Sequence, residues 1–151
     1  MTMYKHILLP TDGSSLAARG IREGVRLAKA VGAKISAVYV ASPFIPPAYG
    51  EGIVYSPGPF SAAEYKKLTQ KHATKVLGAV ERAARAAGVR CRTRLVTDAQ
   101  PWRGILRAAR AGRCDAIVMG SHGRGAVAGL ILGSETNRVL AHSKLPVLVA
   151  R

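Results

Sequence analysis

Short apolar runs alternate with amphipathic helical stretches along the whole chain, and this alternation limits the chain to one class of fold. Five apolar runs are typical of strands, and the first four are each followed by apolar residues at helical spacing. The runs are Tyr4–Leu9, Lys34–Val40, Arg92–Thr97, Asp115–Met119 and Pro146–Ala150. Strands that alternate with helices form βαβ units around a parallel sheet that helices cover on both faces. The pattern therefore predicts a doubly wound α/β fold.

Length and topology rules sharpen this prediction. With 151 residues and 48% hydrophobic content, the chain is long enough to bury one core. We predict a single Rossmann-like domain over residues 1–151, whose five-stranded parallel sheet has the order 3-2-1-4-5. The segment 42–60 holds five of the eight prolines and breaks the alternation, so it reads as a long loop, either a lid or a mobile insertion.

Cap residues indicate where the helices begin and end. Ser14 or Ser15 is suited to cap the first helix, which Gly32 would end. Ser61 and Glu64 have the spacing of a capping box, which predicts the start of a long second helix.

Composition argues against several classes of protein. No apolar run approaches the ~18 residues of a membrane span, and no signal peptide precedes the first strand, so we expect a cytoplasmic protein without a membrane partner. Cys91 and Cys114 are too few for a disulfide framework and lack metal-ligand spacing. We expect both to be reduced thiols in the core or at a strand edge.

The chain is strongly basic. It has 23 Lys and Arg against 8 Asp and Glu, a formal charge of +15, which favours anionic partners. The cations fall at helical spacing within separate helices, as in the set Arg19, Arg22, Arg26 and Lys29. The eight aromatic residues are not interleaved with them as in single-strand binders. We therefore favour a generic basic surface and do not expect nucleic acid as a partner.

Glycines cluster directly after the fourth strand. Gly120 and Gly123 are followed by Gly133 and Ser134, where a helix signal begins. Dense glycines before a helix N-terminus let backbone N–H groups approach a phosphate. Pro10-Thr11-Asp12 ends the neighbouring first strand, so both segments are expected at one crevice. The pattern is neither a Walker A loop nor a dinucleotide fingerprint, and the glycines could also form tight turns only.

The segments His6–Asp12, Ile117–Gly123 and Pro146–Val149 together resemble the universal stress protein family over essentially the whole chain. The spacing Gly120-x2-Gly123-x9-Gly133-Ser134 is similar to that of the family's ATP-binding branch. The resemblance implies a homodimeric regulatory protein of the stress response that binds ATP, with Mg or Mn accompanying the nucleotide. It implies no catalytic residue.

The resemblance also implies roles for individual residues. Gly120, Gly123, Gly133 and Ser134 would hold ribose and phosphates, and Thr136 would reach a phosphate. Pro10, Thr11 and Asp12 would line the nucleoside side, where Asp12 would contact base, ribose or a nucleotide-bound metal. Val40 would contact adenine through its backbone. Met119, His122, Arg124 and Glu135 complete the expected nucleotide-binding set.

Several alternatives stay open. Asp12 could cap the first helix, and His122 could be a solvent-facing loop residue, since the sequence offers it no evident catalytic partner. Glu135 stands where the family usually has a small apolar residue, so its carboxylate would weaken phosphate binding unless it points away or shares a metal. A slow ATPase would draw on Asp12, Arg124, Glu135 and a metal. A third possibility is a module that binds anions or nucleic acid through its charge, with the glycine loop vestigial.

The last strand predicts an assembly. It would lie at a sheet edge, and Val147–Ala150 carries no charge. A bare apolar edge promotes pairing unless it is covered. Pairing with the same strand of a second copy closes around a two-fold axis, and the family resemblance independently implies a dimer built this way.

Overall fold

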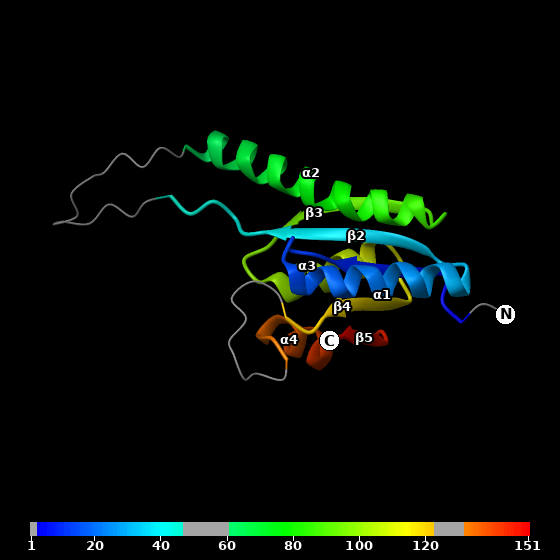
Figure 1. The fold of residues 1–151 in the computed structure, drawn as a ribbon. Helices are drawn as coiled ribbons and strands as arrows, with labels where there is room; N and C mark the ends of the chain where they lie inside the picture. The colour runs from blue at the N-terminus through cyan, green and yellow to red at the C-terminus, as the bar shows by residue number, and fades with distance from the viewer. Residues whose placement is uncertain (1–2, 47–60, 123–131) are drawn as a thin grey trace.

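Strands and helices alternate in the structure from one end of the chain to the other (Figure 1). The computed structural model describes residues 3–46, 61–122 and 132–151. The strands are β1 (His6–Pro10), β2 (Lys34–Ala41), β3 (Cys91–Thr97), β4 (Ala116–Gly120) and β5 (Val147–Ala150). The helices are α1 (Ser15–Val31), α2 (Ala62–Ala86), α3 (Pro101–Ala111) and α4 (Ser134–His142).

The strands form one parallel sheet in the order β3-β2-β1-β4-β5, which confirms the predicted fold class and strand order. The order reverses at β1, which has β2 on one side and β4 on the other. A crevice is therefore expected where β1 and β4 end, because their following segments leave the sheet in opposite directions.

Two apolar cores lie on the two faces of the sheet. Along β1, alternate side chains enter different cores: Ile7 and Leu9 pack with α1 and α2, whereas Leu8 packs with α3 and α4. All five residues of β1 and of β4 are buried, as expected of central strands covered on both faces. This two-sided burial explains why these strands read as continuous apolar runs.

The predicted caps are present. The Ser14 hydroxyl accepts a hydrogen bond from the Ala17 amide at 3.1 Å, and Gly32 ends α1 with a left-handed φ of 71°. Ser61 and Glu64 form the complete capping box at the start of α2. Ser134, where the helix signal begins, could have been the N-cap of α4 by its residue type, but Gly133 occupies that position. Ser134 is instead the first helical residue.

A close backbone contact joins α1 to β4. A Cβ atom at Gly20 would lie 2.4 Å from the Gly120 nitrogen, and one at Gly120 would lie 2.6 Å from the Leu16 carbonyl oxygen. Neither distance is sterically possible, so α1 rests on the end of β4 only because both positions are glycine. Gly120 was predicted as a phosphate ligand, and the fold gives it this packing role as well.

Both cysteines are free thiols, and burial raises their pKa, that of Cys114 to about 11. Their chemistry is that of protonated thiols at neutral pH. Among the described residues, no helix combines the length and the apolar character that crossing a bilayer requires. The lid-or-insertion alternative for 42–60 concerns mostly residues outside the described ranges.

Candidate functional site

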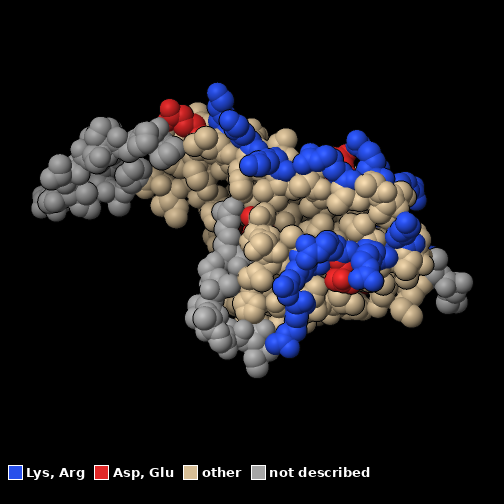
Figure 2. Space-filling model, in the orientation of Figure 1, with Lys and Arg blue, Asp and Glu red and all other residues tan. Residues whose placement is uncertain are grey.

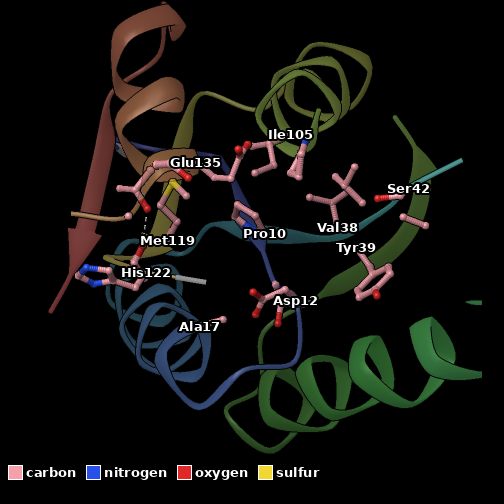
Figure 3. A pocket seen from close by; sticks show the side chains of 18 of the residues that line it. Pro10, Asp12, Ala17, Val38, Tyr39, Ser42, Ile105, Met119, His122 and Glu135 are labelled. Carbon is pink, nitrogen blue, oxygen red and sulfur yellow. Dashed lines mark hydrogen bonds between the residues drawn. The ribbon is translucent and has the colours of Figure 1, made fainter. Parts of the chain in front are cut away.

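A cavity of about 480 Å³ opens at the carboxyl ends of β1, β2 and β4 (Figure 3). It is the kind of concave, mainly apolar space that holds a small ligand, and it lies at the point where the strand order reverses. Most of the predicted site residues line it: Pro10, Thr11, Asp12, Val40, Met119, Gly120, His122, Gly133, Ser134, Glu135 and Thr136. Gly123 and Arg124, also predicted, lie outside the described residues. The segments that follow β1 and β4, which are distant in sequence, thus line one cavity, as the sequence predicts.

One half of the cavity is formed by the ends of β1 and β2, and we call it the nucleoside half because the sequence prediction puts a nucleoside there. The pairing between these strands ends at Pro10 and Val38, and the Thr11 amide then donates to the Val38 carbonyl at 2.9 Å. In a parallel sheet the N–H and C=O of one residue point to the same neighbouring strand, and alternate residues share that direction. The N–H and C=O of Val40 therefore point to the side where β1 has already ended. They provide one donor and one acceptor to whatever occupies the crevice.

The turn after β1 is held by its own side chains. Asp12 accepts a hydrogen bond from the Ser14 amide at 2.9 Å, and Thr11 accepts one from the Gly13 amide at 3.2 Å. Gly13 has a φ of 80°, which favours glycine. Ser14, not Asp12, caps α1, although Asp12 helps to shape the turn before it. Asp12 therefore lines the cavity from a fixed turn.

The other half joins the end of β4 to the start of α4, and we call it the phosphate half because the sequence prediction puts phosphates there. The Gly133 amide donates to the Ser121 carbonyl at 2.7 Å, and the first helical bond runs from the Asn137 amide to the Gly133 carbonyl. The amides of residues 134–136 thus precede Asn137, the first donor of the helix, and have no partner within it. Such N–H groups, together with the helix dipole, favour an anion.

Gly133 has φ −67° and ψ 157°, which any residue can adopt. A Cβ there would lie 3.2 Å from the His122 Cα and 3.3 Å from the Ser121 carbonyl oxygen. A larger residue would therefore press on the segment after β4, and its effect would come from that contact and not from forbidden dihedrals.

Thr136 is buried, and its hydroxyl donates to the Gly120 carbonyl at 3.1 Å. This bond fixes the start of α4 against the end of β4. While it lasts, the hydroxyl proton is not directed at a ligand, so any contact of Thr136 with phosphate would use its backbone N–H.

Glu135 points from α4 towards α3 (Figure 3). One carboxylate oxygen accepts a hydrogen bond from the Trp102 amide at 2.8 Å, and the other pairs with Arg138 at 3.1 Å. The N-cap residue of α3, Gln100, makes no side-chain capping bond, so Glu135 caps this helix from outside it. The cap could not have been found from sequence, because it joins residues 33 positions apart.

The His122 ring lies within hydrogen-bond distance of the Ser121 hydroxyl, at 3.0 Å, and Figure 3 shows it directed away from the centre of the cavity. Its part in binding a ligand stays a prediction.

Several cavity residues were not predicted. They come from the start of α1, from β2 and the residue after it, and from the first turns of α2 and α3: Ala17, Val38, Tyr39, Ala41, Ser42, Tyr65, Thr69, Pro101 and Ile105. Tyr65 is fixed by a hydrogen bond from its hydroxyl to the Ser42 carbonyl at 2.7 Å. Their only signal in sequence was their place near strand ends and helix starts, which is too general to select them.

The fold and the cavity define a doubly wound α/β protein with a candidate ligand site at its topological switch point. Residues 3–151 match the model of the Universal stress protein family, and the chain belongs to that family. It is 36% identical to a universal stress protein of Thermus aquaticus, over 99% of this chain and 100% of that one. It is 30% identical to universal stress protein MJ0531 of Methanocaldococcus jannaschii, over 99% and 83%.

Solved structures share the fold. The protein MJ0577 is 27% identical, with a TM-score of 0.78 over 98% of this chain and 96% of that one. A universal stress protein solved in complex with cAMP is 22% identical, with a TM-score of 0.69 over 98% and 97%. Another, from Archaeoglobus fulgidus in complex with dAMP, is 16% identical, with a TM-score of 0.62 over the full length of both chains. For the last two structures, at 22% and 16% identity, the likeness concerns the fold alone.

Proposed function

We propose that this chain is a single-domain, ATP-binding universal stress protein that acts through nucleotide-dependent binding to partners and not through catalysis. The observation that carries the proposal is the cavity itself, which is lined both by Val40, with its backbone donor and acceptor, and by the N-terminus of α4. A nucleotide site needs two kinds of group in one space: hydrogen-bonding groups for the base and a positive helix end for the phosphates.

The Val40 backbone suits adenine better than guanine. Adenine offers an N6 donor to the Val40 carbonyl, whereas guanine carries an O6 acceptor at that place, which would face the carbonyl oxygen. Other proteins with this fold have been solved with cAMP and dAMP, both of which contain adenine. Discrimination by base is therefore expected.

A metal fits this site only in company with the nucleotide. Among residues 3–46, 61–122 and 132–151, no group of three or more His, Cys, Asp or Glu could hold an ion unaided. Asp12 would then complete the coordination of Mg or Mn carried by the phosphates. The Glu135 carboxylate is engaged with α3 and Arg138, so it is not positioned to bind this metal.

We further propose a homodimer formed through β5. This strand pairs with β4 on one side only, and Leu148 is 46% exposed. Replacing both Val147 and Val149 with Lys should give a monomer in light scattering, since charges at a paired edge oppose association. A dimer with a micromolar Kd is largely formed at a protein concentration of about tens of micromolar. If the wild-type protein is a monomer at that concentration, the proposal is contradicted.

Calorimetric titration tests the nucleotide proposal. ATP should bind with a Kd in the micromolar range or weaker, because the site offers mainly backbone donors and no P-loop lysine. GTP should bind at least about tenfold more weakly. The single tryptophan, Trp102, stacks on His142 with ring centroids 4.3 Å apart, so its fluorescence gives a second readout of the same binding. No heat and no fluorescence change with ATP would refute the proposal.

A further inference from the structure

The basic stripes of α1 and α2 lie on the same face of the protein. Both helices pack on the core that includes Ile7 and Leu9, so both turn their polar sides to the same solvent. In Figure 2, Lys and Arg form one row along α2 and a second group over α1. From the sequence alone, the cations of each helix form a separate solvent-facing stripe. The fold combines them into one surface.

This surface, the α1–α2 basic face, has few counter-charges. Within the part of the chain that the structure describes, only Arg26 and Arg85 form ion pairs there, with Glu23 at 2.9 Å and Glu81 at 3.3 Å. The remaining exposed cations on the two helices have no ion-pair partner among the described residues: Arg19, Arg22, Lys29, Lys66, Lys67, Lys71, Lys75 and Arg82.

The described carboxylates elsewhere are already engaged. Glu64 closes the capping box of α2, and Asp98 pairs with Arg107. Asp115 accepts hydrogen bonds from the Lys5 and His6 amides, and Glu135 caps α3. The eight cations of the basic face are therefore available to an external anion.

The opposite face is different. On α3, α4 and the adjoining turns, Arg107 and Arg138 are paired, which leaves four exposed cations without an ion-pair partner among the described residues: Arg103, Arg110, Arg113 and Lys144. On the same side of the sheet, three further cations are exposed and have no ion-pair partner among the described residues: Lys34 of β2 and Arg92 and Arg94 of β3. The two faces therefore differ in arrangement, because the eight cations of the basic face lie on two adjacent helices.

We propose that the α1–α2 basic face binds the phosphate backbone of double-stranded nucleic acid without sequence preference. The unpaired cations of α1 extend over about 15 Å and those of α2 over about 24 Å at 1.5 Å per residue, or roughly half and two-thirds of one duplex turn of about 34 Å. Each cation that neutralises a phosphate releases counterions, which drives such binding.

A duplex fits this face better than a single strand or a membrane. Tyr65 and His72 are the only aromatic or imidazole rings on α1 and α2, and Tyr65 lines the nucleotide cavity, so the face lacks a platform for stacking bases. Apart from Leu68, which is 51% exposed, the large apolar residues of both helices are buried or partly buried against the core, so the face offers no continuous apolar side to a bilayer.

Fluorescence anisotropy with a labelled DNA duplex of about two helical turns tests this proposal, over about 50 to 200 mM salt. The basic-face variant is Arg19→Gln/Arg22→Gln/Lys75→Gln. The matched control, Arg103→Gln/Arg110→Gln/Lys144→Gln, removes the same charge from the opposite face. All six residues are exposed and without ion-pair partners among the described residues, so both variants should fold, which circular dichroism checks.

Wild-type protein should bind with a Kd near the micromolar range at low salt. The basic-face variant should bind at least about tenfold more weakly, and its log–log salt slope should be shallower by about 2 to 3, at 0.9 per lost phosphate contact. The control should stay within about twofold of wild type, because its residues make no phosphate contact.

Four results would overturn the proposal. Equal weakening in both variants would mean that overall charge attracts the duplex without a defined face. Displacement of the duplex by excess ATP with magnesium would locate it in the nucleotide cavity. Absence of binding at the lowest salt, or tighter binding to anionic phospholipid vesicles than to the duplex, would exclude duplex nucleic acid as the partner of this face.

Discussion

The two halves of the cavity are built in different ways. The nucleoside half consists of strand ends whose backbone groups are directed by the sheet, as at Val38 and Val40. The phosphate half depends on contacts between elements: α1 on β4 at Gly20, α4 on β4 through Thr136, and α4 on α3 through Glu135. The first half follows from strand register, whereas the second requires a particular set of tertiary contacts.

Substitution of Gly20 should have the largest effect, because it breaks the contact on which the phosphate half rests. In Gly20→Val, the Cβ would meet the backbone at Met119 and Gly120 at 2.6 and 2.4 Å. Neither backbone can move without disturbing the central strand, so we expect a loss of about 3 kcal/mol or more in unfolding free energy. Urea unfolding followed by circular dichroism measures this loss.

Gly32→Ala is a suitable control for Gly20→Val. A Cβ at Gly32 meets nothing within 4 Å, so only the strain of its left-handed φ remains, about 1 kcal/mol. Equal losses of unfolding free energy in the two variants would show that the α1–β4 contact does not require glycine at position 20.

Gly133→Val should affect the phosphate half alone. The added side chain would press on Ser121 and His122 and shift the start of α4, which should weaken ATP binding about tenfold or more, or ~1.4 kcal/mol. Adenosine, which has no phosphate, should bind as it does to wild type. Calorimetric titration with both ligands measures the difference, and equal loss for both would break the distinction between the halves.

Gly104→Ala should affect the nucleoside half. A Cβ at Gly104 would lie 2.6 Å from a methyl group of Val40, so α3 or the end of β2 must shift. We expect about fivefold weaker binding of ATP and of adenosine alike, or ~1 kcal/mol. If adenosine binding stayed unchanged while ATP binding fell, Val40 would not contact the base.

Glu135 should show a smaller effect, on stability. Glu135→Ala removes the cap of α3 and should cost about 1 kcal/mol, whereas Glu135→Gln keeps an acceptor for the Trp102 amide and should cost about half as much. Unfolding followed through Trp102 fluorescence compares the two. Tighter ATP binding in Glu135→Ala than in wild type would mean that the carboxylate turns towards the phosphates when the ligand is bound.

This contrast also explains what could be predicted from sequence. Strand order, the caps at Ser14 and Ser61, and the meeting of Pro10–Asp12 with Gly120 follow from periodicity, local chemistry and topology rules. The cap that Glu135 gives to α3, the inward hydrogen bond of Thr136 and the Gly20–Gly120 contact join segments that only the folded chain brings together. For the same reason, the shared basic face of α1 and α2 was not visible in their separate stripes.

An amide NMR titration of the labelled protein with ATP and magnesium tests most directly whether both halves hold one nucleotide. We expect saturable shifts at the Val40 amide and at the amides of Ser134 and Glu135, with one common Kd. Adenosine should shift Val40 and leave the start of α4 unchanged. Lys34 and Asp115, at the opposite end of the sheet, should not move with either ligand. Shifts confined to the basic residues of α1 and α2, or none at the cavity, would contradict the assignment of this cavity as the nucleotide site.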